Sequence, residues 1–403
     1  MQAFFLRECC TEPISSIDCS ESSTEDIHKL LISLTSWDKI FRIFDTNLYN
    51  SSSYSKDEVT RAPAHHNYTV NPSATEYIQC KPTGKCLAQY CSENVYLDCR
   101  FYNSSKLFAG SLGNTLEYIS IDQATINCNI IDKHQAPIRC ISILKNKSII
   151  VSGSWDGSIH FNDIRQLNSI ESICKHQVAG KVFCMDNSHD EEWILIGDSF
   201  KNLNILNIKK LSSNSANKSP MLTIPNYMKY QMRQVKASKY NEYFATSSIE
   251  GRVQINTLNN VISQESSNEY SYTFKCHRFK DMNTMNEIIY PINSLCYHPK
   301  YTDILATGGS DGNVFIWDTI AKKRLWKSPT IDIIENESSI INNYRESIAH
   351  MSFDTIGEFL IVAASDTFDQ GTKVQDIKDL TPTKSQVLFY SVNNVKPFKL
   401  TNI

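Results

Sequence analysis

The sequence predicts an all-β fold in which a single ring of seven four-stranded sheets closes on itself as a β-propeller. Three observations lead to this prediction. One hairpin pattern recurs along the chain, its copies follow at near-regular intervals, and the clearest copy ends in the pair Trp317-Asp318. A four-stranded blade takes roughly 40–45 residues, so seven blades take about 280–315 residues. The 403 residues therefore leave room for inserted loops and termini.

The recurring unit is an apolar run, a turn of small, polar and glycine residues, and a second run that alternates around Ile, Val and Phe. This is the pattern of a β-hairpin. The aligned turn positions 110, 153, 197, 247 and 308 follow one another at intervals of 43, 44, 50 and 61 residues. A weaker seventh copy is AASDTFD (363–369), with its returning strand over 385–392. The six clear copies are LTSWDKIFRIFD (34–45), AGSLGNTLEYIS (109–120), SGSWDGSIHFND (152–163), IGDSFKNLNILN (196–207), TSSIEGRVQINT (246–257) and TGGSDGNVFIWD (307–318).

The ring must close, because an open end would expose unpaired strand edges. We expect residues Gln2 to Arg7 to add as the outer strand of the last blade, beside the C-terminal strands. The polar segment from Thr46 to Ser73 contains NSSSYS and few aliphatic residues, so it cannot bury a core. We expect this segment (46–73) to be a disordered insert between blades 1 and 2. The whole chain, 1–403, is then one WD-repeat type propeller domain.

The composition gives no sign of a nucleic-acid, membrane or metal protein. Lys and Arg number 40 against 43 Asp and Glu, so there is no overall basic field to attract nucleic acid or anionic lipid. Thirteen cysteines are scattered without C-x-x-C pairs, and the densest group, from Cys80 to Cys99, lacks zinc-ligand spacing. No apolar run approaches the roughly 18 residues of a membrane span. We expect a soluble intracellular protein with reduced thiols and without metal or cofactor.

Ser310 lies in Gly308-Gly309-Ser310-Asp311-Gly312, which satisfies the G-x-S-x-G pattern of a hydrolase nucleophile. A nucleophile elbow is a strand-to-helix turn, whereas Ser310 occupies one of six equivalent strand-to-strand turns. No triad partners, phosphate loop or metal motif favours an enzyme elsewhere. The sequence therefore predicts a protein without catalytic residues. His134 stands where WD repeats place a structural histidine, which would tie its loop to the turn residue Asp156.

Several longer motifs resemble one family. They are TSWD (35–38), HQAPIRC (134–140), KYQMR (229–233), SIEGRV (248–253), FKCHR (274–278) and SDTF (365–368). Together they resemble the mitotic-checkpoint propellers of the budding-uninhibited-by-benzimidazole (BUB) group, which act at kinetochores. The sister family, the propellers of nuclear mRNA export, shares SIEGRV and FKCHR. The resemblance runs from about Ile14 to Val392, although blade 4 is degenerate and the loop after the first hairpin is long.

The resemblance implies two ligands and a place in the spindle assembly checkpoint. The first ligand is the GLEBS segment of a checkpoint kinase and of its pseudokinase relative. Trp37 and Trp155 match the positions at which the family contacts this segment. An exposed turn tryptophan is a typical binding hot spot, although a tryptophan packed under its own turn is the alternative.

The second implied ligand is a kinetochore scaffold segment of Met-Glu-Leu-Thr type that is phosphorylated on its threonine. Recognition of a phosphate requires converging cationic donors, and Arg233, Arg252 and Lys275 match the basic positions of the family. Solvated surface charges are the alternative. We expect blade 5 and the start of blade 6 to bring the three side chains together.

The resemblance favours a non-catalytic adaptor that carries checkpoint kinases to unattached kinetochores. Such a protein is nuclear, localises to kinetochores in mitosis, and works as a monomeric propeller in hetero-complexes without direct nucleic-acid or membrane contact. The alternative is the mRNA-export role, in which a nuclear-pore GLEBS segment is bound. That role calls for a basic RNA-binding face, which the balanced charge disfavours. A ubiquitin-ligase substrate receptor is a third possibility that only the fold suggests.

Overall fold

A computed structural model gives the fold of this chain. It describes residues 3–6, 9–10, 12–20, 30–46, 81–122, 125–167, 172–211, 221–225, 228–241, 243–263, 271–281, 285–328, 346–367 and 385–392. No helix within these ranges has the length and apolarity needed to cross a membrane. The helical elements among these residues are the short α1 (Leu258–Ser263) and one 3-10 turn (Lys239–Asn241).

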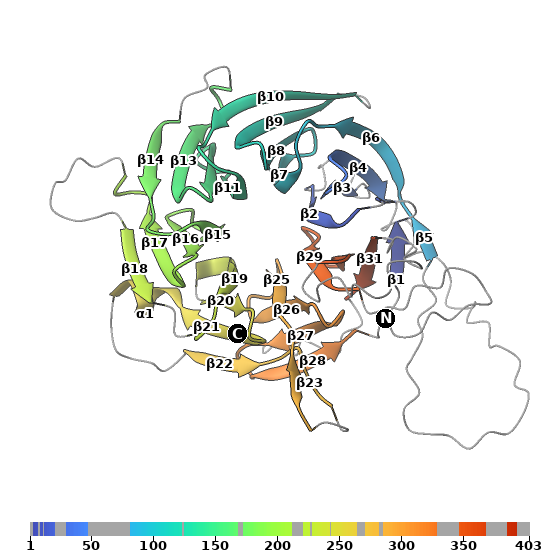
Figure 1. Cartoon of the computed structure of the whole chain (residues 1–403), viewed down its shortest axis with the longest axis vertical. Helices are drawn as coiled ribbons and strands as arrows, with labels where there is room; N and C mark the ends of the chain where they lie inside the picture. The colour runs from blue at the N-terminus through green and yellow to red at the C-terminus, as the bar shows by residue number, and fades with distance from the viewer. Residues whose placement is uncertain are drawn as a thin grey trace, which may run out of the picture.

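Seven β-sheets of four or more strands stand around one axis, so the predicted seven-bladed propeller is confirmed (Figure 1). Blades 2 to 6 are each built from four consecutive strands, and blade 7 takes its fourth strand from the N-terminus. The predicted hairpins form the second and third strands of their blades. The strands of blades 1 to 3 are β2 (Ile14–Cys19), β3 (Leu30–Ser36), β4 (Ile40–Thr46) and β6 (Lys85–Cys91); β7 (Tyr96–Asn103), β8 (Lys106–Ser111), β9 (Thr115–Asp122) and β10 (Thr125–Lys133); β11 (Ile138–Leu144), β12 (Ile149–Ser154), β13 (Ser158–Asp163) and β14 (Cys174–Gln177).

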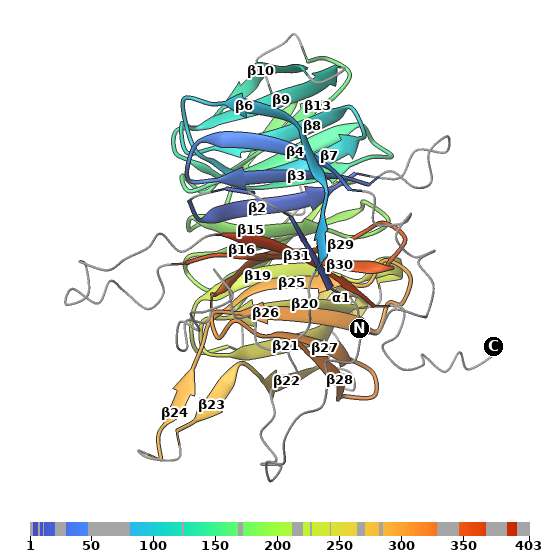
Figure 2. The ribbon, with the colours of Figure 1, turned by 90° about the vertical axis from the view of Figure 1, so that its right-hand side faces the viewer.

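The remaining blades follow the same order, and one extra hairpin leaves the ring between blades 5 and 6. This hairpin, β23 (Arg278–Lys280) with β24 (Glu287–Ile289), projects from the ring in Figure 2. The strands of blades 4 to 7 are β15 (Val182–Asn187), β16 (Trp193–Asp198), β17 (Asn202–Asn207) and β18 (Met221–Pro225); β19 (Met232–Ala237), β20 (Tyr243–Ser248), β21 (Arg252–Thr257) and β22 (Tyr272–Lys275); β25 (Ile292–Tyr297), β26 (Ile304–Gly309), β27 (Val314–Asp318) and β28 (Lys323–Lys327); β29 (Ile348–Phe353), β30 (Phe359–Ala364), β31 (Gln386–Ser391) and β1 (Ala3–Leu6).

The second strand of a blade lies between two neighbouring blades, and its sequence reflects this position. Every residue of β26 (ILATGG) and of β30 (FLIVAA) is buried, because both faces of these strands pack against another sheet. Gly308 shows how close this packing is, since a Cβ atom there would lie 2.5 Å from Ile348 of blade 7. The positive φ of the turn comes from a different glycine, Gly312, at 68°. The continuous small and apolar runs in the sequence thus mark sheets stacked on both sides.

The ring closes as predicted, by pairing of the N-terminal strand with the C-terminal strands. Strand β1 runs antiparallel to β31, with Ala3 opposite Tyr390 and Phe5 opposite Leu388. A short strand that the sequence analysis did not predict, β5 (Lys81–Thr83), pairs in parallel with the free edge of β1. Blade 7 therefore has five strands, and β1 is its fourth strand rather than its outermost one.

One prediction about blade 1 is wrong in its placement. The polar segment 46–73 was expected between blades 1 and 2, but β4 ends at Thr46 and pairs with β6, which begins at Lys85. The two strands belong to one sheet, so the segment connects the third and fourth strands of blade 1. Apart from Thr46 itself, the segment lies outside the described residues, and its disorder stays a prediction.

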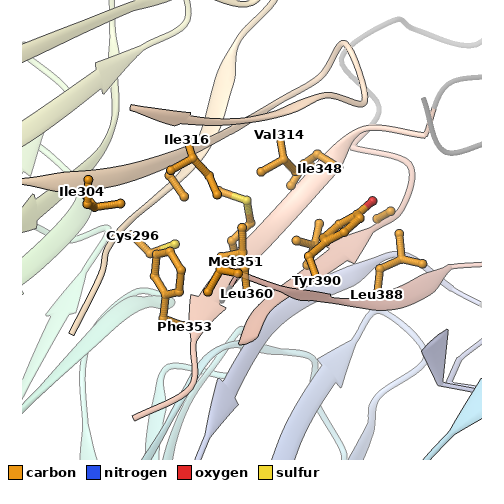
Figure 3. Close-up of a cluster of buried hydrophobic side chains, with 14 residues drawn as sticks. Cys296, Ile304, Val314, Ile316, Ile348, Met351, Phe353, Leu360, Leu388 and Tyr390 are labelled. Carbon is orange, nitrogen blue, oxygen red and sulfur yellow. The ribbon is translucent and has the colours of Figure 1, made fainter. Parts of the chain in front are cut away.

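The core is divided among the boundaries between adjacent blades. In the cluster between blades 6 and 7, Met351, Leu360 and Tyr390 meet Ile304, Val314 and Ile316 (Figure 3). Similar clusters fill the boundaries of blades 4 with 5 and 5 with 6. Each blade is therefore stabilised by its two neighbours, which leaves the turns at the ends of the strands free to carry binding residues.

We expect the propeller to tolerate shortening of the polar segment within blade 1. Deletion of most of residues 47–72, with a short Gly-Ser connection retained between β4 and β5, should shift the thermal midpoint by only a few degrees. The reason is that loop-closure entropy changes slowly with loop length. Differential scanning calorimetry of the deletion variant and its parent measures this shift. Loss of cooperative unfolding would show that the segment contributes a necessary part of blade 1.

Candidate ligand-binding face

The candidate sites lie on one face of the ring, which we call the turn face. It carries the turns between the second and third strands of the blades. In each blade, the first turn residue donates its backbone N–H to a carbonyl just before the first strand. In blades 1, 3, 5 and 6 the donors and acceptors are Trp37 to Pro13 (2.9 Å), Trp155 to Pro137 (2.9 Å), Ile249 to Gln231 (3.1 Å) and Ser310 to Pro291 (3.0 Å). These four residues thus hold equivalent positions, and the alignment made from the sequence is confirmed.

Ser310 has structural contacts. It lies in a strand-to-strand turn between β26 and β27, is 1% exposed, and its Oγ accepts a hydrogen bond from Asn293 Nδ2 at 2.9 Å. The turn interpretation of the G-x-S-x-G pattern is therefore confirmed, because a nucleophile elbow would require a helix after the serine.

Trp37 presents a large apolar surface on the turn face. Its side chain is 46% exposed in a turn that is otherwise well fixed. Asp38 fixes that turn, since its Oδ1 accepts the Ile40 N–H at 2.9 Å and its Oδ2 forms a 2.6 Å ion pair with Arg42. A rigid backbone that holds out an exposed indole suits a binding hot spot, because little entropy is lost when a ligand covers the ring.

Trp155 is half-buried at the equivalent position of blade 3. Its Nε1 atom is buried, and it has no hydrogen-bond partner within the described part of the chain. A ligand on the turn face can contact the exposed part of the Trp155 side chain, whereas the N–H lies beneath the surface. Both predicted tryptophans therefore sit at the turn face, Trp37 largely exposed and Trp155 half-buried.

The loop before blade 3 is joined to its turn through hydrogen bonds that differ from the one predicted. His134 Nδ1 lies 3.9 Å from Asp156, which is beyond hydrogen-bond distance. Instead Nδ1 shares a 2.6 Å hydrogen bond with Ser158 Oγ, and Nε2 shares one of 2.8 Å with Ser152 Oγ. Asp156 is occupied by the N–H of Gln135 at 2.8 Å. His134 and Asp156 thus both join the loop to the turn, as predicted, although Ser158 and Ser152 are the hydrogen-bond partners of the histidine.

In blade 6 the histidine of the preceding loop forms a direct hydrogen bond to the turn aspartate. The sequence predicted a histidine–aspartate link of this kind for blade 3. His277 Nδ1 lies 2.7 Å from Asp311 Oδ1, and its Nε2 lies 2.9 Å from Thr307 Oγ1. Trp317 Nε1 donates to the same Thr307 oxygen at 3.1 Å. The signal in the sequence was the histidine of FKCHR about thirty residues before the turn.

A second histidine stacks on His134. The rings of His134 and His160 are 3.7 Å apart and nearly parallel, and His160 Nδ1 lies 2.8 Å from Asp132 Oδ2. The ligand atoms of the three side chains lie within 4.8 Å of one another, which is also the spacing of a metal site. The hydrogen bonds already use both nitrogens of His134, so we interpret the cluster as structural.

This cluster gives a pH prediction. Burial, with the adjacent His160, lowers the pKa of His134 from 6.5 to about 4. The unfolded chain binds a proton at this residue below about pH 6.5 while the folded chain does not, so its contribution to stability is complete above pH 6.5 and is lost toward pH 4. Wild type should lose about 1 kcal/mol per pH unit more than His134→Gln between these values, the scale of one titrating group. Urea unfolding at pH 6.5 and 5 measures the difference; parallel pH profiles would contradict the prediction.

In blade 5 the structure brings two of the three predicted phosphate-binding residues together. Arg252 begins β21 and lies directly opposite Lys275 in β22, at the turn-face end of the sheet. Lys275 is exposed, and the Arg252 side chain is 38% exposed. Among the described residues, neither the terminal nitrogens of Arg252 nor Lys275 Nζ forms a hydrogen bond or an ion pair. Two cationic groups on adjacent strands can therefore bind one anion together.

The third predicted residue, Arg233, lies on the other side of the same blade. It is the extra residue of a bulge near the start of β19, and its Nη2 donates to Asn293 Oδ1 of blade 6 at 2.8 Å. Arg252 faces the opposite way, because its neighbour Val253 packs into the boundary with blade 6 and side chains alternate along a strand. Arg233 can join Arg252 and Lys275 only if its guanidinium leaves Asn293.

An apolar group that the sequence did not predict lies beside Arg252. Phe200 in the blade 4 turn is 63% exposed, Tyr230 before β19 is 46% exposed, and Ile249 in the blade 5 turn is 38% exposed. Lys201 Nζ donates to the Lys229 carbonyl at 3.3 Å, which joins the turn that carries Phe200 to the loop that carries Tyr230. Exposed aromatic residues next to cationic groups are a typical arrangement for binding a peptide with both apolar and anionic residues.

The chain is similar in sequence to WD-repeat proteins of known name. A family model described as "WD domain, G-beta repeat" matches residues 127–163 and 270–318. The chain is 31% identical over 276 residues to "Mitotic checkpoint protein bub-3" of Caenorhabditis elegans, covering 68% of this chain and 72% of that protein. It is 30% identical over 287 residues to "Spindle assembly checkpoint protein bub3" of Schizosaccharomyces pombe, covering 71% and 80%.

Two further similarities are more distant. The "mRNA export factor GLE2" of Chaetomium thermophilum is 28% identical over 216 residues, covering 52% of this chain and 55% of that protein. A chain of a solved structure named "Crystal Structure of Mitotic Checkpoint Complex" matches with a TM-score of 0.61 over 97% of this chain and 91% of its own length. Its sequence identity is 13%, so this match supports the propeller fold alone.

Proposed function

Since this chain belongs to the Bub3 family of mitotic checkpoint WD-repeat propellers, we propose that it is a non-catalytic adaptor that holds two peptide ligands at once. One ligand is the GLEBS segment of a checkpoint kinase or its pseudokinase relative. The other is a Met-Glu-Leu-Thr segment of a kinetochore scaffold, phosphorylated on its threonine. The adaptor then recruits the kinase to kinetochores that lack microtubules, and it is nuclear before it acts there.

The separation of two unlike groups of residues on the turn face supports the proposal most strongly. Trp37 and Trp155, on blades 1 and 3, offer aromatic surface, which is largest at Trp37. Arg252 and Lys275, on blade 5, offer a pair of cations. A segment of mixed composition suits the first group, and a phosphate suits the second. Because the groups lie on different blades, both ligands can bind without competing for the same residues.

The surroundings of Arg252 suit a phosphorylated segment with apolar neighbours. A phosphothreonine carries nearly two negative charges, which match the paired Arg252 and Lys275. Phe200, Tyr230 and Ile249 offer apolar area to the Met and Leu of the motif. We assign Arg233 a secondary role at this site, because it must exchange its contact with Asn293 for one with the ligand.

A role in mRNA export is the second candidate, favoured by the similarity to the export factor GLE2 over about half of the chain. Affinity capture from mitotic cells, with quantification of the bound proteins, separates the two. The checkpoint function predicts that a GLEBS-containing kinase dominates and that the kinetochore scaffold is recovered only when phosphorylated. Predominance of a nuclear-pore protein with bound RNA would favour the export function instead.

A further inference from the structure

Glu250 is an acidic residue at the centre of the cationic site on blade 5. It is the middle residue of the three-residue turn Ile249-Glu250-Gly251, immediately before Arg252. Its side chain is only 11% exposed, whereas that of Arg252 is 38% exposed. A carboxylate that lies beneath an arginine at an anion site calls for an explanation, because a negative charge there opposes the binding of a phosphate.

The contacts of Glu250 are directed away from the ligand side of the arginine. Its Oε2 forms an ion pair of 3.2 Å with Arg252 Nε, the nitrogen nearest the backbone. The pair is a charge contact rather than an aligned hydrogen bond, since Nε has no aligned acceptor. The two terminal nitrogens, which form the fork that binds phosphate in a bidentate manner, are left for a ligand.

The other end of the same carboxylate joins a second segment of the site. Glu250 Oε1 accepts the backbone N–H of Lys229 at 3.1 Å. Lys229 lies in the loop before β19, next to the exposed Tyr230, and its own carbonyl accepts Lys201 Nζ of blade 4. One side chain therefore links Arg252 to the loop that carries the apolar part of the site.

The turn that carries Glu250 is itself fixed by hydrogen bonds from the projecting hairpin. Arg278 of the projecting hairpin donates from Nη2 to the Glu250 carbonyl at 2.8 Å and from Nε to the Gly251 carbonyl at 3.3 Å. Gly251 has a φ of 61°, and a Cβ atom there would lie 2.7 Å from the Cys276 carbonyl. The backbone of the turn thus has little freedom, and the carboxylate is held in place beneath Arg252.

We propose that Glu250 is the positioning residue of the phosphate site, which aims the Arg252 fork outward and ties it to the Lys229 loop. This inference rests on the proposed reading of a phosphorylated Met-Glu-Leu-Thr segment. It leads to a result that charge alone does not predict. Removal of a negative charge next to a phosphate site strengthens binding if the charge only repels the ligand. If the charge aligns the arginine, its removal weakens binding.

The experiment measures dissociation constants by calorimetry for a phosphorylated and an unphosphorylated Met-Glu-Leu-Thr peptide. Glu250→Ala should weaken phosphopeptide binding by about tenfold, the order expected when the support of a binding group is lost. Glu250→Gln keeps an acceptor for the Lys229 N–H and should lose less. The matched control is Glu192→Gln, which removes the same charge from the loop between β15 and β16, where Glu192 pairs with Lys209 on the face opposite the turns. It should bind the phosphopeptide at least as well as wild type.

Binding of a GLEBS peptide and the thermal midpoint show whether the variants are intact, and both should be unchanged in Glu250→Gln. If Glu250→Ala and Glu250→Gln bind the phosphopeptide as tightly as wild type or more tightly, the positioning role is wrong. The phosphate site itself would remain valid. If wild type binds the phosphorylated and unphosphorylated peptides with equal affinity, the proposed function and this inference are both wrong. A parallel loss of both peptide and GLEBS affinity in Glu250→Gln assigns the residue to general folding, which also contradicts the proposal.

Discussion

Arg252→Glu should reduce the affinity for a phosphorylated Met-Glu-Leu-Thr peptide by at least tenfold. The change removes charge-assisted hydrogen bonds worth roughly 1.5–3 kcal/mol and adds repulsion toward the phosphate. Every 1.4 kcal/mol or so is a factor of ten in affinity. Lys275→Glu should behave in the same way, because the two residues lie opposite each other on β21 and β22. Arg233→Glu should have a smaller effect, since Arg233 contacts Asn293 on the other side of the blade.

Calorimetry on the three variants measures these losses, and a charge reversal elsewhere serves as the control. Arg165 is highly exposed and follows the end of β13, on the face opposite the turns. Arg165→Glu changes the net charge by the same amount and should leave peptide affinity unchanged. If wild type binds the unphosphorylated peptide as tightly as the phosphopeptide, Arg252 and Lys275 are ordinary surface charges. An equal loss in the control would point to overall charge instead of a site.

Trp155→Ala or Trp37→Ala should weaken binding of a GLEBS peptide by about 2 kcal/mol or more, the scale of a hot-spot aromatic residue. Trp37→Ala should cost little stability, because the residue is 46% exposed on a turn that Asp38 fixes independently. Trp155→Ala should cost somewhat more, because the residue is half-buried. Phosphopeptide affinity should be retained in both, since Arg252 and Lys275 lie on another blade.

Trp326 provides the matched comparison for these variants. It packs against the core between blades 6 and 7, with its ring 5.4 Å from that of Tyr390. Trp326→Ala should lower the thermal midpoint, as loss of a packed aromatic side chain does, while GLEBS affinity stays unchanged. Unchanged GLEBS affinity together with a large loss of stability in Trp37→Ala would show that Trp37 is also a packing residue and that the assignment from the family is wrong.

The sequence predicted the ring because its signal is local. A hairpin turn such as Gly308 to Gly312 and the two strands around it lie within one short segment, so the pattern repeats wherever a blade repeats. The outer strands give a weaker signal. Strand β6 (KCLAQYC) is mostly exposed and pairs with β4 across a long insert. The sequence of neither strand indicates that the two strands pair. This is why the insert was placed after blade 1 instead of inside it.

The site was predictable in its residue types and less so in its geometry. Arg252 and Lys275 follow from motif positions, and strand pairing brings them together. The direction of Arg233 depends on a bulge near the start of β19, because an inserted residue changes which face the following side chains take. The role of Glu250 depends on which nitrogen of Arg252 it contacts, and that contact is set by the folded turn. Neither the direction of Arg233 nor the contact of Glu250 can be predicted from the spacing of the residues in the sequence.

Simultaneous binding of the two ligands tests the adaptor function most directly. A phosphorylated Met-Glu-Leu-Thr peptide is titrated into the free protein and into protein saturated with a GLEBS peptide, and the dissociation constants are compared. We place the GLEBS site on blades 1 and 3 and the phosphopeptide site on blade 5, so we expect a ternary complex. In it the phosphopeptide should bind as tightly as it does to the free protein, or more tightly. Displacement of one peptide by the other, or loss of phosphopeptide binding in the saturated protein, would contradict the two-ligand function.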